Sequence, residues 1–211
     1  MTLIKKITKK KFIPAFNLWL EGNDDPLVIS MDLITKYKLG VGSYVENNEL
    51  DKILSEQELI NAKQAAYNYV SYKSRSEHQI KEKLSSKGFT QDLIEDAIQF
   101  LYEFNLLDDR KFARSFVKSK IELKKYGKGR LKIELLKKGI NKEIIEDTLN
   151  EVYPEHDKYK MALELAEKKY RIIRNKPKNK IYTSIKYFLQ RQGFDWEVTK
   201  KTLDALLKQE D

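Results

Sequence analysis

The sequence predicts a mainly α-helical protein: three tandem three-helix repeats, each resembling a helix-turn-helix unit, form an elongated curved array after a small N-terminal β-rich segment. Three observations support this fold class. Charged residues make up 35% of the 211 positions, with only eight glycines and four prolines, a composition that favours long surface helices over sheets with tight turns. An apolar pattern ending in glycine occurs three times. The first 50 residues instead contain short strand-like runs.

The strongest signal is a repeated helix end at Gly88, Gly139 and Gly193, spaced by 51 and then 54 residues. Each glycine follows a leucine by four residues and an aliphatic residue by eight; these residues are Leu84, Leu135 and Leu189, and Ile80, Leu131 and Ile185. Such an apolar stripe indicates one buried helical face. We expect each glycine to end its helix in the left-handed conformation.

A further helix is predicted after each glycine. Thr90, Asn141 and Asp195 stand two positions after the three glycines, and their side chains suit the N-cap of a helix. The core positions that follow also coincide, with a spacing of five and then three: Leu93, Ile98 and Leu101; Ile144, Leu149 and Val152; Val198, Leu203 and Leu206. This spacing is typical of one buried face.

A third helix precedes each of these pairs, over residues 56–72, 109–123 and 157–173. The predicted repeats are therefore 51–107, 108–154 and 155–211. Capping boxes are predicted at Ser55 with Glu58 and at Ser76 with Gln79, and Asp108 or Asp109 is expected to cap the helix at 109. A unit of this size buries only part of its apolar surface alone, so neighbouring copies should stack.

Residues 1–50 are predicted to form a small β-meander with a short helix. Strands are expected at 3–8, 12–20 and 26–29, with a turn at 21–25. Ser30 suits the N-cap of a helix over 31–38, which Gly40 and Gly42 would end. This segment either packs on the first repeat or binds a partner separately.

Composition argues against several classes of protein. There is no cysteine, so disulfides and thiolate chemistry are excluded. The N-terminus lacks a signal-peptide core, and no apolar run is long enough for a bilayer, so a cytoplasmic location without membrane contact is expected. His78 and His156 are too distant in sequence to suggest a metal site or a catalytic triad. We expect no enzyme activity, metal or cofactor.

The formal charge of +9 is unevenly distributed: +1 over residues 1–50, −3 over 51–108, +6 over 109–153 and +5 over 154–211. A basic second half suits a polyanion or an acidic protein surface, although a solvated surface has the same composition. The helix start at 126–130 is a candidate anion contact through free amides. The candidate partner- or DNA-binding residues are Arg110, Lys111, Arg114, Lys118, Lys128, Arg130, Lys132, Lys137, Lys138, Arg174, Lys176 and Lys178; the last three lie in a predicted flexible loop over 174–180.

The segments 107–117, 126–130 and 135–140 carry an acidic pair before Phe-Ala and an aromatic residue, then Gly-x-x-Arg, then a leucine helix ending in Lys-Gly-Ile. Over residues of about 60 to 210 the chain resembles the RecX family of recombination regulators. Residues 179–181 depart from the pattern, because they replace the glycine-containing turn.

The resemblance implies a monomer that binds the filament of the recombinase RecA on DNA, in its helical groove, and restrains ATP hydrolysis and strand exchange. Such a protein acts in homologous recombination, DNA repair and the SOS response. Weak contact with single- or double-stranded DNA is expected through the basic repeats. The alternative from the residues themselves is a sequence-specific helix-turn-helix DNA-binding protein. Phe112, Ala113, Phe116 and Val117 are interpreted as a core stripe.

Overall fold

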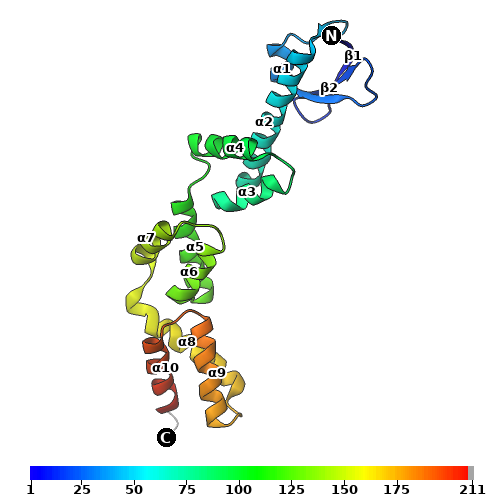
Figure 1. Ribbon diagram of the computed structural model, residues 1–211. Coiled ribbons are helices and arrows are strands. Elements are labelled where there is room, and N and C mark those ends of the chain that lie inside the picture. Colours follow the sequence, from blue (N-terminus) through cyan, green and yellow to red (C-terminus); the bar gives the residue numbers. More distant parts are fainter. Residues whose placement is uncertain (209–211) are drawn as a thin grey trace. The chain divides into compact units, whose positions relative to one another are not determined.

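The computed structural model describes residues 1–208 and confirms a mainly helical protein with a β-rich N-terminal segment (Figure 1). The strands are β1 (Thr2–Lys9), β2 (Ala15–Leu20), β3 (Leu27–Ser30) and β4 (Tyr44–Val45). The helices are α1 (Met31–Lys36), α2 (Asn47–Tyr72), α3 (Glu77–Ser85), α4 (Gln91–Glu103), α5 (Asp109–Lys124), α6 (Lys128–Leu136), α7 (Lys142–Val152), α8 (Lys158–Ile173), α9 (Lys178–Arg191) and α10 (Trp196–Lys208), with a 3-10 turn at Glu155–Asp157. Within the described residues, no helix is both apolar and long enough to span a bilayer.

The chain divides into two compact units. The first comprises residues 1–71 and 83–104, and the second comprises residues 72–82 and 105–211. The first turns of α3 thus belong to the second unit, and the end of α3 belongs to the first.

The first unit contains an antiparallel sheet in the order β3-β2-β1-β4. One face of this sheet buries Ile4, Leu18 and Ile29, which share a core with Leu33 of α1 and Ile53 of α2. The predicted meander is confirmed, whereas β4 was missed because a two-residue strand has no readable alternation. The side chain of Ser30 caps α1 by accepting from the amide of Leu33 at 3.4 Å.

Helix α2 begins earlier than predicted, and it crosses residue 50 without a break. Ser55 therefore lies inside the helix, where its hydroxyl donates to the carbonyl of Asp51 at 2.9 Å, and the predicted capping box with Glu58 is wrong. Burial of Ile53 against the sheet extends the helix beyond what local capping signals suggest. In the same unit, Lys63 of α2 lies over the ring of Phe100 of α4, 5.6 Å from its centroid.

The second unit has one continuous core formed by α5–α7 together with α8–α10. Phe112, Ala113 and Val117 are buried in it, with Phe116 at its margin, so the predicted core stripe is confirmed. Helices α8, α9 and α10 lie side by side (Figure 1). The loop before α9 is shorter than predicted: α9 starts directly after Pro177, so residues 178–180 are helical.

The three glycines end their helices as predicted, with φ of 88° at Gly88, 73° at Gly139 and 91° at Gly193. In the helices that follow, Asn141 accepts from the amide of Glu143 and Asp195 from that of Val198, both at 2.8 Å. Thr90 occupies the N-cap position but its side chain makes no capping hydrogen bond.

Val198 of α10 is buried as predicted, but in α4 and α7 the first buried position lies one residue later than predicted. Ile94 and Ile145 are buried, whereas Leu93 and Ile144 are only partly buried. The later positions of the predicted face, such as Ile98, Leu149 and Leu203, are buried as expected.

Candidate functional site

The acidic pair before α5 serves two different helices. Asp108 accepts a hydrogen bond from the amide of Lys111 at 2.9 Å and so caps α5 itself. Asp109 instead accepts from the amide of Glu77 at 2.9 Å, in the first turn of α3. Burial raises the pKa of the Asp109 carboxyl, and the hydrogen bond from Glu77 lowers it in part. Both carboxylates are structural, and no cluster suited to a metal ion occurs among the described residues.

The start of α3 also contacts the end of α6. Ser76 and Gln79 form the predicted capping box, with each side chain 3.3 Å from the amide of the other residue. The buried hydroxyl of Ser76 also donates to the carbonyl of Lys138 at 2.7 Å. A side chain on Gly139 would collide with the side chain of His78. The imidazole of His78 is half exposed, but its Cβ faces Gly139.

The same joint recurs one repeat later. The amide of Gly127, at the N-cap of α6, donates to the carbonyl of Gln192 at 2.8 Å, and the amide of Gly129 donates to Gly193 at 3.0 Å. A side chain on Gly193 would collide with the backbone of Arg130, and one on Gly127 with the backbone of Gly193. In the first and second repeats, the first turn of the middle helix therefore contacts the glycine-ended turn of the following repeat.

This joint overturns one prediction about 126–130. Free amides at the start of α6 were expected to offer an anion contact, yet the amides of Gly127 and Gly129 are occupied by the end of α9. The backbone of Lys128 bonds to the hydroxyl of Tyr153. The Gly-x-Gly spacing allows close approach of another backbone, and the sequence motif alone does not reveal what approaches it.

A hollow of about 800 Å³ lies beside this joint, between α6, the segment before α8, and the α9–α10 turn. Lys128, Arg130 and Lys137 line it together with Glu155 and Asp195. Burial, together with the charges of Glu155 and Asp195, raises the pKa of Tyr153 in its wall to about 12. The lining thus carries charges of both signs and one neutral phenol.

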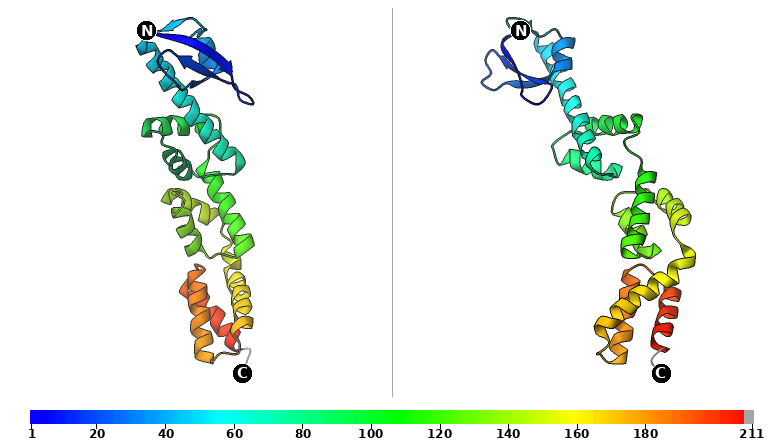
Figure 2. Two further views of the ribbon diagram at one scale, coloured as in Figure 1. Left: turned by 90° about the vertical axis from the view of Figure 1, so that its right-hand side faces the viewer. Right: turned by 180° about the vertical axis from the view of Figure 1, so that it is seen from behind.

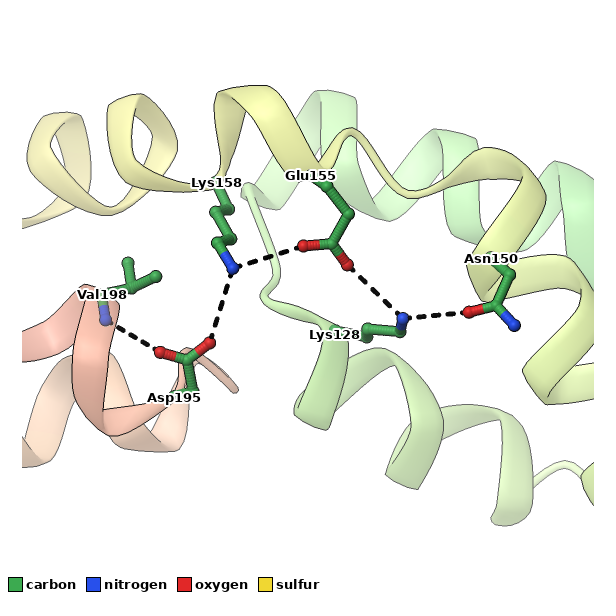
Figure 3. A network of polar contacts seen from close by, with 6 residues as sticks. All are labelled: Lys128, Asn150, Glu155, Lys158, Asp195 and Val198. Carbon is green, nitrogen blue, oxygen red and sulfur yellow. Dashed lines mark hydrogen bonds and ion pairs between the residues drawn. The ribbon is translucent and has the colours of Figure 1, made fainter.

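A chain of polar contacts crosses the same region (Figure 3). The ammonium of Lys128 lies 3.1 Å from Asn150 and 3.4 Å from Glu155. Lys158 lies 3.4 Å from Glu155 and 3.9 Å from Asp195, and Asp195 caps α10 through Val198. These contacts connect α6, α7, α8 and α10.

Several predicted binding cations are paired with acids of α7. Arg110 lies 2.9 Å from Asp147 and Arg114 lies 2.8 Å from Glu151. These two ion pairs join α5 to α7 about one helical turn apart. Lys132 of α6 contacts Glu146 and lowers the pKa of that carboxyl. Such exposed pairs stabilise a fold only weakly, so a partner can exchange them at little cost.

Arg130 and Lys138 are held by other groups. The guanidinium of Arg130 stacks 4.1 Å from the ring centroid of Tyr126, is 3.1 Å from Gln192 and lies near Glu134. Lys138 lies 5.4 Å from the ring centroid of Phe116.

The remaining predicted cations are distributed over three places. Lys111 and Lys118 are exposed on α5, Lys137 is exposed at the end of α6, and Arg174, Lys176 and Lys178 are exposed around the start of α9. Among the described residues, no acidic side chain pairs with Lys111, Lys118 or Lys137. Lys111 and Lys118 stand two helical turns apart on α5, which places them on one face.

These features define a helical repeat protein whose neighbouring repeats meet through hydrogen bonds and close packing at their glycine-ended turns. Sequence models of RecX match three segments: the first three-helix domain at residues 62–101, the second at 108–149 and the third at 155–203. The chain belongs to the RecX family of regulatory proteins.

Individual relatives extend the match to the N-terminal segment. The chain is 36% identical over 210 residues to regulatory protein RecX of Clostridioides difficile (strain 630), covering 98% of this chain and 97% of that protein. It is also 36% identical over 212 residues to regulatory protein RecX of Clostridium tetani, covering 97% and 95%. A crystal structure of regulatory protein RecX matches with a TM-score of 0.74 at 25% identity, over 97% of this chain and all of that chain.

Proposed function

We propose that this protein regulates the recombinase RecA by binding in the groove of the RecA filament on DNA and restraining ATP hydrolysis and strand exchange. The observation that carries the proposal is membership of the RecX family over the three helical domains. The proposal places the protein in the cytoplasm, where it acts as a monomer in recombination and DNA repair.

The joint between the second and third repeats supports this mode of action. Main-chain hydrogen bonds from Gly127 and Gly129 fix the two repeats to one another, and both repeats share one apolar core. Two contact surfaces held at a fixed separation bind a periodic filament more tightly than either does alone, because the second contact forms intramolecularly.

The contact residues that we propose are the exposed cations of the second and third repeats. Lys111, Lys118 and Lys137 are the strongest of these, because no internal ion pair has to be broken before they meet an acidic surface or a phosphate. The paired cations Arg110, Arg114 and Lys132 contribute only after exchange of their partners on α7. Basic side chains of this kind also give weak, salt-sensitive contact with DNA.

The alternative of a sequence-specific helix-turn-helix protein receives less support. A recognition helix presents its N-terminal residues to base edges, but the first turn of α6 is occupied by the end of α9. Helix α7 exposes Glu143, Asp147 and Glu151, and these carboxylates cannot donate hydrogen bonds to the phosphates on either side of a groove.

The test is the ATPase activity of RecA on single-stranded DNA. We expect the purified protein to lower this activity at amounts well below one molecule per recombinase, because one bound regulator affects several neighbouring subunits of a filament. Activity that stays unchanged at a molar excess of the protein would disprove the proposal.

Charge variants then locate the contact. A triple change of Lys111, Lys118 and Lys137 to Glu should raise the concentration needed for half inhibition by tenfold or more, since opposite charges at an interface become like charges. The matched control changes Lys52, Lys73 and Lys87 to Glu; these are also exposed and alter the net charge equally. Equal loss in both variants would point to net charge and not to a specific contact.

A further inference from the structure

The β1–β2 hairpin of the first unit is strongly and uniformly basic. Residues 1–20 contain five lysines and no acidic residue. Of these, Lys9, Lys10 and Lys11 follow one another at the tip, and Lys9 and Lys11 are exposed. The first acid in the chain, Glu21, lies 3.9 Å from Lys5 at the opposite end of the hairpin. The tip therefore carries a concentrated positive charge, although residues 1–50 as a whole are almost neutral.

An exposed aromatic side chain directly follows the three lysines of the tip. Phe12 is fully exposed at 101% of its reference area, and Ile13 beside it is 47% exposed. The backbone of Phe12 has φ of 69°, a left-handed conformation that is uncommon for a bulky residue. The hairpin reaches past the rest of the sheet and ends in this loop (Figure 2). The tip thus presents a large ring to solvent, where folding gains nothing from its apolar area.

The outward face of the sheet also carries a lysine beside an aromatic ring. Lys6 is paired with Trp19 across β1 and β2, and its ammonium lies 5.1 Å from the centroid of the indole ring. Thr8 and Asn17 form the pair after next, and side chains alternate between faces along a strand. Lys6, Trp19, Thr8 and Asn17 therefore share the face opposite to the buried Ile4 and Leu18.

We propose that the β1–β2 hairpin is a binding surface for single-stranded nucleic acid. The lysines of the tip contact phosphates, the ring of Phe12 stacks on an unpaired base, and Trp19 with Lys6 offers a second stacking position on the sheet. Proteins that bind single strands without sequence preference combine these two elements, a basic track and aromatic side chains. Stacking requires an unpaired base, so the surface favours single strands over duplex.

The composition of the surface distinguishes it from a membrane contact. An interfacial anchor needs a continuous apolar face, whereas here polar Thr8 and Asn17 follow Trp19 along the sheet and three lysines directly precede Phe12. Five cations around two separated aromatic rings match the alternation of phosphates and bases along a strand.

The experiment measures fluorescence of the full-length chain during titration with oligothymidylate, without any recombinase. Trp19 and Trp196 are the two tryptophans, so the variant Trp196→Phe leaves Trp19 as the reporter. We expect quenching of Trp19 that saturates and weakens with salt, and weaker binding of a duplex of equal length. Because RecA is absent, the result is independent of the regulatory proposal above.

Two variants in this background test the tip. Phe12→Ala should weaken binding by roughly tenfold, whereas Phe12→Trp should retain it, because stacking needs a ring and not a particular one. Changing Lys9, Lys10 and Lys11 to Gln should lower the salt dependence by about two units of slope. The matched control changes Lys52, Lys73 and Lys87 to Gln and should leave binding unchanged.

Three outcomes would overturn the proposal. The first is binding that is equal in the tip variants and the original chain. The second is a duplex bound as tightly as the single strand. The third is a response of Trp19 to vesicles of phosphatidylglycerol with none to oligothymidylate, which would assign the hairpin to a membrane surface.

Discussion

Asp108 and Asp109 are neighbours of identical chemistry with different partners. Asp108 satisfies an amide at the start of its own helix, which is the ordinary use of an N-cap aspartate. Asp109 is already inside α5 and reaches Glu77, at the start of α3. The second carboxylate therefore connects two repeats, and its burial raises its pKa.

The raised pKa of Asp109 leads to a prediction about how the free energy of unfolding depends on pH. Between the ordinary value of 3.8 and the raised value in the folded chain, the folded state binds more protons than the unfolded state. The free energy of unfolding therefore falls as pH rises through this window. Asp109→Asn removes the ionisation but keeps an oxygen that accepts from Glu77, so we expect this variant to lack that component of the pH dependence.

Urea unfolding of the original chain and of Asp109→Asn between pH 4 and pH 7 measures this difference. Asp109→Ala serves as the comparison, because it also removes the hydrogen bond and should lose about 1 kcal/mol at pH 7. An asparagine variant as unstable at pH 7 as the alanine variant would show that the negative charge itself is needed.

At the scale of single elements, the turn after each middle helix has one conformation in three environments. Gly88, Gly139 and Gly193 all have positive φ. A Cβ added at Gly88 would meet nothing within 4 Å among the described residues, whereas one at Gly139 or Gly193 would collide with the preceding repeat. Glycine is required at position 88 only because of the left-handed backbone conformation. At positions 139 and 193 it is also required because the preceding repeat leaves no space for a side chain.

This difference predicts a graded response to alanine. Gly88→Ala should cost about 1 to 2 kcal/mol, the penalty of a left-handed non-glycine residue. Gly193→Ala adds a collision with the backbone of Arg130 and should cost roughly 1 to 3 kcal/mol more. Urea unfolding followed by far-UV circular dichroism compares the two variants, and equal losses would mean that the joint at Gly193 yields without strain.

The same elements show how far the sequence alone can go. Helix ends depend on local chemistry, so the conformation of the three glycines, the capping box at Ser76 and the caps Asn141 and Asp195 were all predictable. Contacts with other repeats cannot be inferred from the local sequence. The spacing of Gly127 and Gly129 does not indicate which backbone packs against these glycines, and nothing in the sequence around His78 indicates its contact with Gly139. The observed start of α2 differs from the predicted one because the helix is buried against the sheet.

The candidate site was predictable in its charge but not in its pairing. Composition indicated a basic second half, and some of its cations, such as Lys111 and Lys118 of α5, are exposed. Their acids on α7, such as Glu146 and Asp147, are distant in sequence, so the ion pairs of Arg110 and Lys132 follow only from the packing of the three helices.

At the scale of the whole molecule, apolar side chains gather in distinct cores. One core joins the sheet with α1 and α2, and another joins α5–α7 with α8–α10. The first of these cores lies within the first compact unit and the second within the other. Trp19 belongs to the first unit and Trp196 to the second, so each unit has its own fluorescent reporter.

We expect the two units to unfold as separate cooperative transitions. In urea, Trp196→Phe should report the first unit through Trp19, and Trp19→Phe the second through Trp196, with different midpoints. Adding Gly193→Ala to each should lower only the midpoint seen by Trp196. Coincident midpoints that shift together would indicate one cooperative unit.

The joint between the second and third repeats consists largely of peptide groups, with hydrogen bonds from Gly127 and Gly129 and space left by absent side chains. Main-chain atoms are the same whatever residue carries them. Substitution of exposed cations that take no part in this joint, such as Lys111 and Lys118, is therefore expected to leave the angle between these repeats unaltered, so that contact with a partner can be changed without changing the scaffold.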